Sequence, residues 1–282
     1  MKRRLFPTLC FVVFTSIVSA QETVELMDFE SISYSDSLIT DMKIVDYGSD
    51  DESERYRMGT SRNYYEAYTL KAVGGPRRAV DFINKWLMVN QTDHVTPPIT
   101  VEKVNSGYGK LLGNGLRTIG DVLKSSSSRF LQGELLEESS FETGSYHING
   151  VDVVWNTGRL LTFQDHGTDY SAGAAHGMPW NQYVTFDLTQ LRQLMLDDII
   201  KKEYWDVVLQ MISEELEDGF VEELPSNDID FPSNEPGLTA EGIIFVYSAY
   251  EIGPYSLGMP EVILEYDKVW KYMTEKAKAL IE

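Results

Sequence analysis

Alternating apolar and polar residues near the N-terminus predict two strands followed by a helix. Residues 37–47 and 64–73 have the composition and spacing of strands, and the second segment ends at a Gly-Gly-Pro sequence. Pro76 suits the first turn of a helix. The following residues place apolar side chains on one helical face at steps of three and four: Val80, Ile83, Trp86 and Leu87.

Residues 99–138 have a weaker pattern. Their apolar positions favour one or two short helices and are Leu111, Leu116, Ile119, Val122 and Leu123. Glycines within 107–115 and four serines at 125–128 interrupt this pattern. The serines are typical either of a flexible hinge or of a loop.

Strand patterns dominate from residue 141 onward. Residues 146–156 contain Asn149-Gly150, a favoured two-residue hairpin loop, and therefore predict a hairpin. Residues 159–165 and 182–188 alternate between apolar and polar side chains, which indicates two further strands.

The last third of the chain mixes helices with strands. Asp197 and Asp198 suit the first turn of a helix, whose apolar stripe comprises Tyr204, Val207, Val208, Met211, Ile212 and Leu216. Further along we expect an acidic loop, two strands and a C-terminal helix, at 218–240, 243–250, 261–266 and 267–281. This mixed order predicts an α+β fold, with mainly antiparallel sheets packed against helices.

The first twenty residues have the features of an export signal. Three basic residues precede an apolar segment at 5–18, and Val18-Ser19-Ala20 provides a cleavage site. A membrane span needs about 20 apolar residues, so this segment is too short to be an anchor. Lipid attachment at Cys10 would leave too few apolar residues before it, and simple secretion is favoured. We expect a periplasmic or extracellular protein without a transmembrane segment in its mature chain.

Cleavage there leaves two predicted subdomains, at 21–138 and 139–282. The full chain has a net charge of −20, and removal of the signal leaves 21 basic against 44 acidic residues. This composition argues against nucleic acid and anionic membranes as partners. It is compatible with a cationic partner, although acidity also keeps exported proteins soluble. The mature chain has no cysteine, so a hydrophobic core must hold the fold.

Several segments together resemble a known exported family. They are Gly173-Ala174-Ala175-His176-Gly177, residues 183–188, Leu194-Met195-Leu196-Asp197-Asp198, and residues 238–245, 250–255 and 260–262. In order and spacing they are similar to the domain shared with the lysozyme-sensing anti-sigma factor RsiV, a family otherwise of unknown function. The resemblance covers roughly 170–270. Residues 37–90 resemble the smaller domain that commonly precedes it and that also occurs in an exported peptidoglycan deacetylase.

The resemblance implies a fold related to a subdomain of the Hsp70-type ATPases and a receptor role outside the cytoplasm. Lysozyme, a strongly basic protein, is the ligand of that relative, and the acidity of this chain would favour such an encounter. Signalling through a sigma factor does not carry over, since the chain lacks the relative's cytoplasmic segment and transmembrane helix.

Two loops, at 166–180 and 248–261, carry the candidate binding residues, which are Tyr170, His176, Tyr250, Glu251, Tyr255 and Glu261. Small residues around His176 would let a ligand approach the backbone closely. Alternatively, this histidine ties its own loop to the main chain. Tyrosine provides a large contact area at low entropic cost. The alternative for the second loop is that its tyrosines cover a sheet edge while Glu251 caps backbone donors.

Known catalytic templates are absent from the sequence. It has no nucleophile elbow, phosphate-binding loop or dinucleotide fingerprint, and we expect no cofactor. A metal site from His166, Asp169 and His176 lacks a recognised spacing. Tyrosines at 64, 65 and 68 and the tryptophan at 86 are expected in the core or at a sheet edge.

Three functions remain open. The first is a non-catalytic protein that binds a protein or a cell-wall glycan through the two loops. The second is a cell-wall or carbohydrate hydrolase that uses Glu251, Glu261 or His176, which requires two carboxylates about 5–10 Å apart. The third is a subunit of an envelope complex, which requires an exposed apolar patch of several hundred Å².

Overall fold

The computed structural model describes residues 25–46, 48, 55–92, 96–135, 137–220 and 229–282. The expected export signal and part of the acidic loop, at 221–228, lie outside these residues. Across the described ranges, no helix combines the length and the apolar character needed to cross a membrane.

Ten strands form two sheets within the described residues. The larger sheet contains β1 Asp28–Val45, β2 Tyr56–Gly74, β3 Glu138–Ser139, β4 Tyr146–Asn156, β5 Leu160–Tyr170, β6 Met178–Asp187 and β7 Arg192–Gln193. The smaller sheet contains β8 Gly237–Leu238, β9 Gly242–Val246 and β10 Glu261–Glu265. The strand order of the larger sheet is β3-β1-β2-β4-β5-β6-β7, and its pairs are antiparallel except β1 with β3 and β2 with β4. The predicted α+β class with mainly antiparallel sheets is confirmed.

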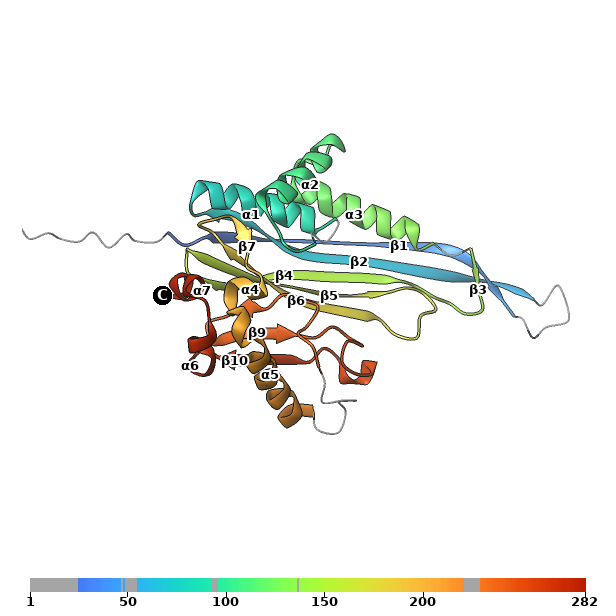
Figure 1. The fold of residues 1–282 in the computed structure, drawn as a ribbon. Coiled ribbons are helices and arrows are strands. Elements are labelled where there is room, and N and C mark those ends of the chain that lie inside the picture. The colour runs from blue at the N-terminus through green and yellow to red at the C-terminus, as the bar shows by residue number, and fades with distance from the viewer. Residues whose placement is uncertain (1–24, 47, 49–54, 93–95, 136, 221–228) are drawn as a thin grey trace, which may run out of the picture.

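Seven α-helices complete the described fold. They are α1 Arg77–Asn90, α2 Val101–Gly113, α3 Ile119–Gly133, α4 Leu196–Ile199, α5 Trp205–Phe220, α6 Tyr266–Val269 and α7 Glu275–Ile281. Short 3-10 turns occur at Lys202–Tyr204, Tyr255–Leu257 and Trp270–Tyr272. Helices α1 to α3 gather on one side of the larger sheet, whereas α5 and the smaller sheet lie on the other side (Figure 1).

The predicted apolar stripe of α1 packs on the larger sheet as expected. Trp86 is fully buried and contacts Phe163 and Phe186, with ring centroids 4.9 Å apart in both pairs. Ile83 and Leu87 are also fully buried in this cluster. Burying a large apolar side chain contributes about 1.5–3 kcal/mol, so this contact anchors the helix firmly.

The smaller sheet docks on the opposite side of the larger one through two buried threonines. Thr162 donates to the carbonyl oxygen of Leu238 (2.7 Å), and Thr185 accepts from the Leu238 N–H (2.9 Å). Small β-branched side chains at these positions let the backbone of β8 approach β5 and β6. Around this contact lies a second apolar core that includes β9, β10 and α5.

The predicted hairpin at 146–156 is wrong, because this segment is the single continuous strand β4. A Cβ at Gly150 would lie 2.8 Å from Cε1 of His166, so glycine makes room there for the imidazole ring. Asn149 donates instead to the side chain of Gln91 at 3.0 Å. The chain reverses between β4 and β5, at Gly158, whose φ of 80° favours glycine.

The short helices expected within 99–138 are present, but the expected interruptions are only partly right. Residues 107–113 and the serines at 125–128 are helical, whereas Asn114-Gly115 ends α2. A Cβ at Gly107 would stand 2.6 Å from Val89, so glycine lets α2 pack closely on α1. In α3, Ser126 donates to the carbonyl oxygen of Gln91 at 2.9 Å. Thr118 and Asp121 form a capping box that begins α3. Tertiary contacts therefore replace the hinge or loop that the serines suggested.

Other boundaries shift more modestly. Asp197 and Asp198 lie in the separate short helix α4. Of the predicted stripe, Tyr204 lies in a 3-10 turn and the other residues lie in α5, where Val207 is exposed rather than buried. The predicted C-terminal helix is broken into α6, a 3-10 turn and α7. A new helix, α7, begins after Thr274, because the Thr274 side chain caps it by accepting a hydrogen bond from the Ala277 N–H.

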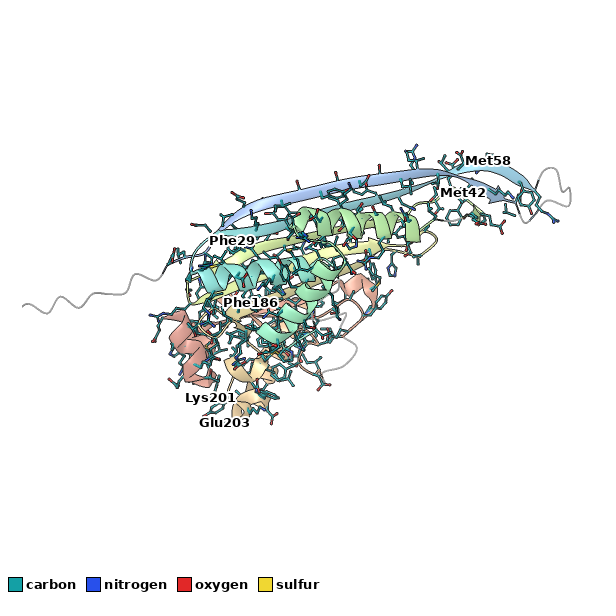
Figure 2. All side chains as sticks on the ribbon, turned by 90° about the horizontal axis from the view of Figure 1, so that it is seen from above. Phe29, Met42, Met58, Phe186, Lys201 and Glu203 are labelled. Carbon is teal, nitrogen blue, oxygen red and sulfur yellow. The ribbon has the colours of Figure 1, made fainter. Side chains whose placement is uncertain are left out.

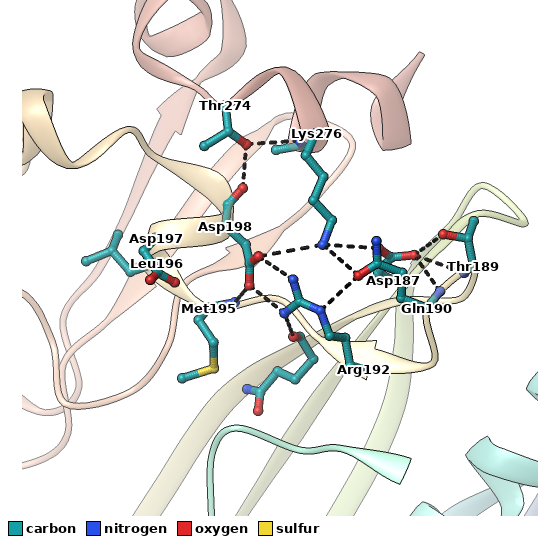
Figure 3. Close-up of polar contacts among 12 residues, drawn as sticks. Asp187, Thr189, Gln190, Arg192, Met195, Leu196, Asp197, Asp198, Thr274 and Lys276 are labelled. Carbon is teal, nitrogen blue, oxygen red and sulfur yellow. Dashed lines mark hydrogen bonds and ion pairs between the residues drawn. The ribbon is translucent and has the colours of Figure 1, made fainter.

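A network of charges fastens α7 to the sheet (Figure 3). Arg192 binds the carboxylate of Asp198 with two nitrogens, and Lys276 lies between Asp198 and Asp187, at 3.6 and 3.3 Å. Burial of Asp198 opposes its ionisation. The hydrogen bonds from Arg192 and the Met195 N–H, with the nearby positive charges, outweigh this and hold the pKa of Asp198 below its usual range.

The larger sheet contains strands from both predicted subdomains. β2, which precedes residue 138, pairs in parallel with β4, which follows it. The division at 138–139 stays a prediction about how the chain is organised.

Candidate binding face

The structure brings the two candidate loops into direct contact at His176. The imidazole stacks on the ring of Tyr255, with centroids 3.6 Å apart and an interplanar angle of 18°. Its Nε2 lies 2.7 Å from the hydroxyl of Tyr250, and its Nδ1 lies 3.0 Å from the carbonyl oxygen of Gly177. A carbonyl only accepts, so Nδ1 carries the proton. In the neutral ring Nε2 then accepts from Tyr250.

The same carbonyl joins the second loop to the first. Tyr255 donates its hydroxyl proton to the oxygen of Gly177 at 2.8 Å. His176 therefore ties its own loop to the main chain and also contacts the tyrosines of the other loop. The result is a fixed group of three rings, of which Tyr250 is 52% exposed. The role of His176 in binding a ligand stays a prediction.

Tyr250 has an unusual backbone conformation, with φ of 70°. A non-glycine residue in this region costs of the order of 1–3 kcal/mol and persists only where its surroundings hold it. Glu251 provides that hold, because its carboxylate accepts from the N–H groups of Ser248 (2.6 Å) and Ser233 (2.5 Å). Both of its oxygens thus cap backbone donors.

Glu261 lies at the start of β10 and faces β6. Its carboxylate accepts from the side-chain amide of Asn181 at 2.5 Å. Burial raises the pKa of Tyr183, and the charge of Glu261 raises it further, while a hydrogen bond involving Asn181 lowers it. The Glu261 carboxylate therefore adds negative charge beside the loops and orients an amide of the neighbouring strand.

Tyr170 ends β5 and belongs to a row of tyrosines across three strands. It lies opposite Tyr146 on β4, with the rings stacked 5.3 Å apart, and Tyr146 lies opposite Tyr64 on β2. These side chains line a shallow hollow of about 410 Å³ that also includes Arg62. Cross-strand neighbours share one face of a sheet, so the three tyrosines form a continuous surface.

This surface reaches the paired loops through Gly177. A Cβ at Gly177 would lie 2.9 Å from the hydroxyl of Tyr146, so the loop packs directly on the strand residue. We call the whole set the tyrosine row; its members are Tyr64, Tyr146, Tyr170, His176, Tyr250 and Tyr255.

Carboxylates share this face of the sheet. Glu66 follows Tyr64 by two residues on β2, and Asp152 on β4 lies 3.0 Å from Nε2 of His166. Tyr65, one position from Tyr64, points the other way and is buried under α3. The face is therefore aromatic and acidic.

The structure does not assemble the metal site considered from His166, Asp169 and His176. Asp169 pairs with Nδ1 of His147 at 2.5 Å, and His166 pairs with Asp152. Alternation along β5 directs residues 166 and 169 to opposite faces. Within the described ranges, no three histidine, cysteine or acidic side chains form a group suited to a metal ion.

Sequence reasoning missed Tyr146 and Asp152 and placed Tyr64 in the core or at a sheet edge. The false hairpin at Asn149-Gly150 concealed the register that aligns Tyr146 with Tyr170. Tyr64 is 37% exposed, whereas Tyr65 and Trp86 are buried as expected. Burial alternates strictly over 59–67 in the fold, but the buried positions include Ser61 and Asn63, so the sequence carries no matching apolar alternation that separates Tyr64 from Tyr65.

Comparisons with known proteins agree with this architecture. Residues 197–267 match the family described as "Protein of unknown function (DUF3298)". The matched segment is similar to members of this family; it contains the loop with Tyr250 and Tyr255, whereas His176 lies outside it. A search of curated proteins finds no match.

Two solved structures are similar over most of their length. A DUF3298 family member from Bacteroides fragilis is 17% identical, with a TM-score of 0.58, and the match covers 90% of this chain and 96% of that one. A DUF3298 family protein from Pseudomonas aeruginosa is 16% identical, with a TM-score of 0.48 and coverage of 86% and 95%. The first of these establishes a shared fold.

Proposed function

We propose that this protein is an exported, non-catalytic binding protein whose tyrosine row holds a protein or a cell-wall glycan. The observation that carries the proposal is the stack of His176 on Tyr255, with the hydroxyl of Tyr250 at 2.7 Å. Rings fixed in this way lose little entropy when a ligand binds. Their faces suit sugar rings and cationic side chains.

Charge supports a cationic protein as the first partner to test. The full chain has a net charge of −20, and Glu66, Asp152 and Glu261 lie on the side of the tyrosine row. The resemblance to the extracytoplasmic domain of RsiV points to a lysozyme-like protein. The same resemblance supports export and a relation to an Hsp70-type subdomain.

Binding has more support than hydrolysis. A catalytic carboxylate must exchange a proton or attack the substrate, yet both oxygens of Glu251 accept from backbone N–H groups. Release of these bonds would free the turn that holds Tyr250. Glu251 is therefore better suited to fixing the loop than to reacting.

The test is a binding titration of the purified protein with lysozyme and, separately, with soluble peptidoglycan fragments, at low and high salt. We expect one of these ligands to bind, and Tyr250→Ala or Tyr255→Ala to weaken binding by about 2 kcal/mol, roughly 30-fold, as for a central aromatic contact. High salt should weaken the complex with lysozyme.

A matched control is Tyr56→Ala, since Tyr56 is exposed to a similar degree (48%) but lies at the start of β2, outside the tyrosine row. It should bind like the wild type. Equal binding by all three variants would contradict the proposed role of the tyrosine row.

A further inference from the structure

The outer edge of β1 is a long strand edge without a partner. Its 18 residues pair with β2 along one side, but on the other side only Lys43 and Ile44 pair, with β3. In the described part of the chain, residues 29–42 have no strand beyond them. Viewed from above, β1 runs along the margin of the molecule, with the helices on one side of it (Figure 2).

Backbone geometry tells which groups on this edge are open. The Lys43 N–H donates to the carbonyl oxygen of Glu137, so it points away from β2. Because backbone groups alternate along a strand, the odd-numbered residues share this direction. They are Ser31, Ser33, Ser35, Ser37, Ile39 and Asp41.

One of these donors is already covered. The Ser37 N–H is accepted by the carboxylate of its neighbour Asp36 at 2.8 Å. For the other odd-numbered backbone groups between 31 and 41, the described residues provide no hydrogen-bond partner. An edge of this length presents a regular ladder of free donors and acceptors, which is the template for strand addition.

Among the usual protections of an edge strand, this edge has only acidic side chains. Natural edge strands are guarded by lysine, proline or a bulge, yet residues 29–42 contain neither lysine nor proline, and the register shifts only at Asp28/Phe29. The odd-numbered residues, whose backbone groups point away from β2, are mainly serines. Their small side chains stand on the face of the sheet and do not hinder an incoming strand. The even positions Ile32, Tyr34 and Leu38 pack under α3 and keep the strand in place.

We propose that β1 binds an extended, cationic polypeptide segment by adding it as a further strand of the larger sheet. Four exposed carboxylates lie along the strand, at Asp28, Glu30, Asp36 and Asp41, and residues 28–42 contain no lysine or arginine. A lysine- or arginine-bearing strand would neutralise them across the new pairing. A second copy of β1 would instead place carboxylates against carboxylates, which disfavours self-pairing.

This interaction uses main-chain hydrogen bonds at the sheet edge and does not depend on the tyrosine row. It adds a second docking surface to the binding function proposed above. The two surfaces lie on different elements, since β1 contributes no residue to the tyrosine row.

Hydrogen exchange of the whole protein tests the proposal. The probe is an end-blocked eight-residue peptide of alternating lysine and valine, and its counterpart with glutamate in place of lysine is the control. At saturation we expect the lysine peptide to slow exchange roughly ten-fold or more at the amides of Ser31, Ser33, Ser35, Ile39 and Asp41. The glutamate peptide should leave these amides unchanged.

A pair of variants separates the backbone from the side chain. Ser35→Pro removes an outward N–H without removing a bond to β2, and Ser35→Ala changes only the side chain. The proline variant should weaken peptide binding at least about ten-fold, a loss of about 1.4 kcal/mol, and the alanine variant should bind like the wild type. Tyr250→Ala should leave the protection of β1 intact.

Three results would overturn the inference: no protection of β1 by the lysine peptide, equal protection by both peptides, or protection that rises with protein concentration alone. The last would identify a second copy of the chain as the occupant. If Ser35→Pro fails to fold, the exchange of the wild-type protein still decides between these outcomes.

Discussion

Replacing Lys276 by methionine removes a positive charge that two carboxylates share. Nζ of Lys276 lies 3.3 Å from Asp187 and 3.6 Å from Asp198. The side chain of Asp187 is only 1% exposed, that of Asp198 is 16% exposed, and that of Lys276 is 31% exposed. Methionine keeps the length and the apolar stem of lysine, so the change is mainly one of charge.

The expected loss follows from this burial. Removal of one member of a fully buried ion pair costs about 3–5 kcal/mol, because the other charge is left without its partner. Solvent reaches the lysine, and Asp187 keeps hydrogen bonds from Thr189 and Gln190, which both reduce the loss. We therefore expect Lys276→Met to lower the free energy of unfolding by about 2 kcal/mol. In a protein of this size the melting temperature should fall by about 3–4 °C.

The assay is equilibrium denaturation by urea at pH 7. The control is Lys268→Met, because Lys268 forms a comparable pair with Glu215 but both side chains are more than 40% exposed. Exposed pairs contribute little, so the control should unfold at the wild-type midpoint. If Lys276→Met also unfolds at the wild-type midpoint, the reasoning about the buried network is refuted.

Three further predictions concern acid stability, helix packing and backbone strain. The folded pKa of Asp198 is lowered, so its ionised form contributes stability above the unfolded pKa, near 3.9, and this contribution is lost as the pH falls below that value. Asp198→Asn should therefore have a lower melting temperature than the wild type at pH 7. Its melting temperature should fall less than that of the wild type between pH 4 and pH 2. Gly107→Ala should destabilise the protein by about 1 kcal/mol or more, because the new Cβ would meet Val89. Gly109→Ala has free space around its Cβ and should stabilise the protein by about 0.5–1 kcal/mol. Urea midpoints that shift in the same direction for both variants would contradict this. Tyr250→Gly should relieve the backbone strain of the positive φ and raise the free energy of unfolding by up to about 1 kcal/mol, while it weakens ligand binding. A loss of several kcal/mol would instead show that packing of the tyrosine ring outweighs the backbone strain.

Local sequence patterns predicted the elements whose buried side chains recur at a regular spacing. The stripe containing Trp86 predicted α1 because burial of one helical face decides where that helix lies. Asn149-Gly150 has equally strong turn chemistry, yet it lies within β4. There the distant residues His166 and Gln91 provide the contacts that override the local preference. A single sequence does not reveal such partners.

The candidate site was predicted in part for the same reason. Residue types and loop context identified His176, Tyr250 and Tyr255 as candidates. Only the fold brings the centroids of their rings to within 6 Å of one another. The role of Glu251 as a clamp depends on the N–H of Ser233, which is 18 positions away in the chain. Tyr146 was missed because its partner across the sheet depended on a register that the predicted hairpin excluded.

Native mass spectrometry of the protein mixed with lysozyme and with peptidoglycan fragments tests the central claim most directly, since one spectrum reports both complexes and products. We predict a complex whose ligand keeps its original mass, and whose abundance falls sharply for Tyr250→Ala. Shortened glycan fragments that vanish for Glu261→Gln would contradict the account, because the protein would then act as a hydrolase.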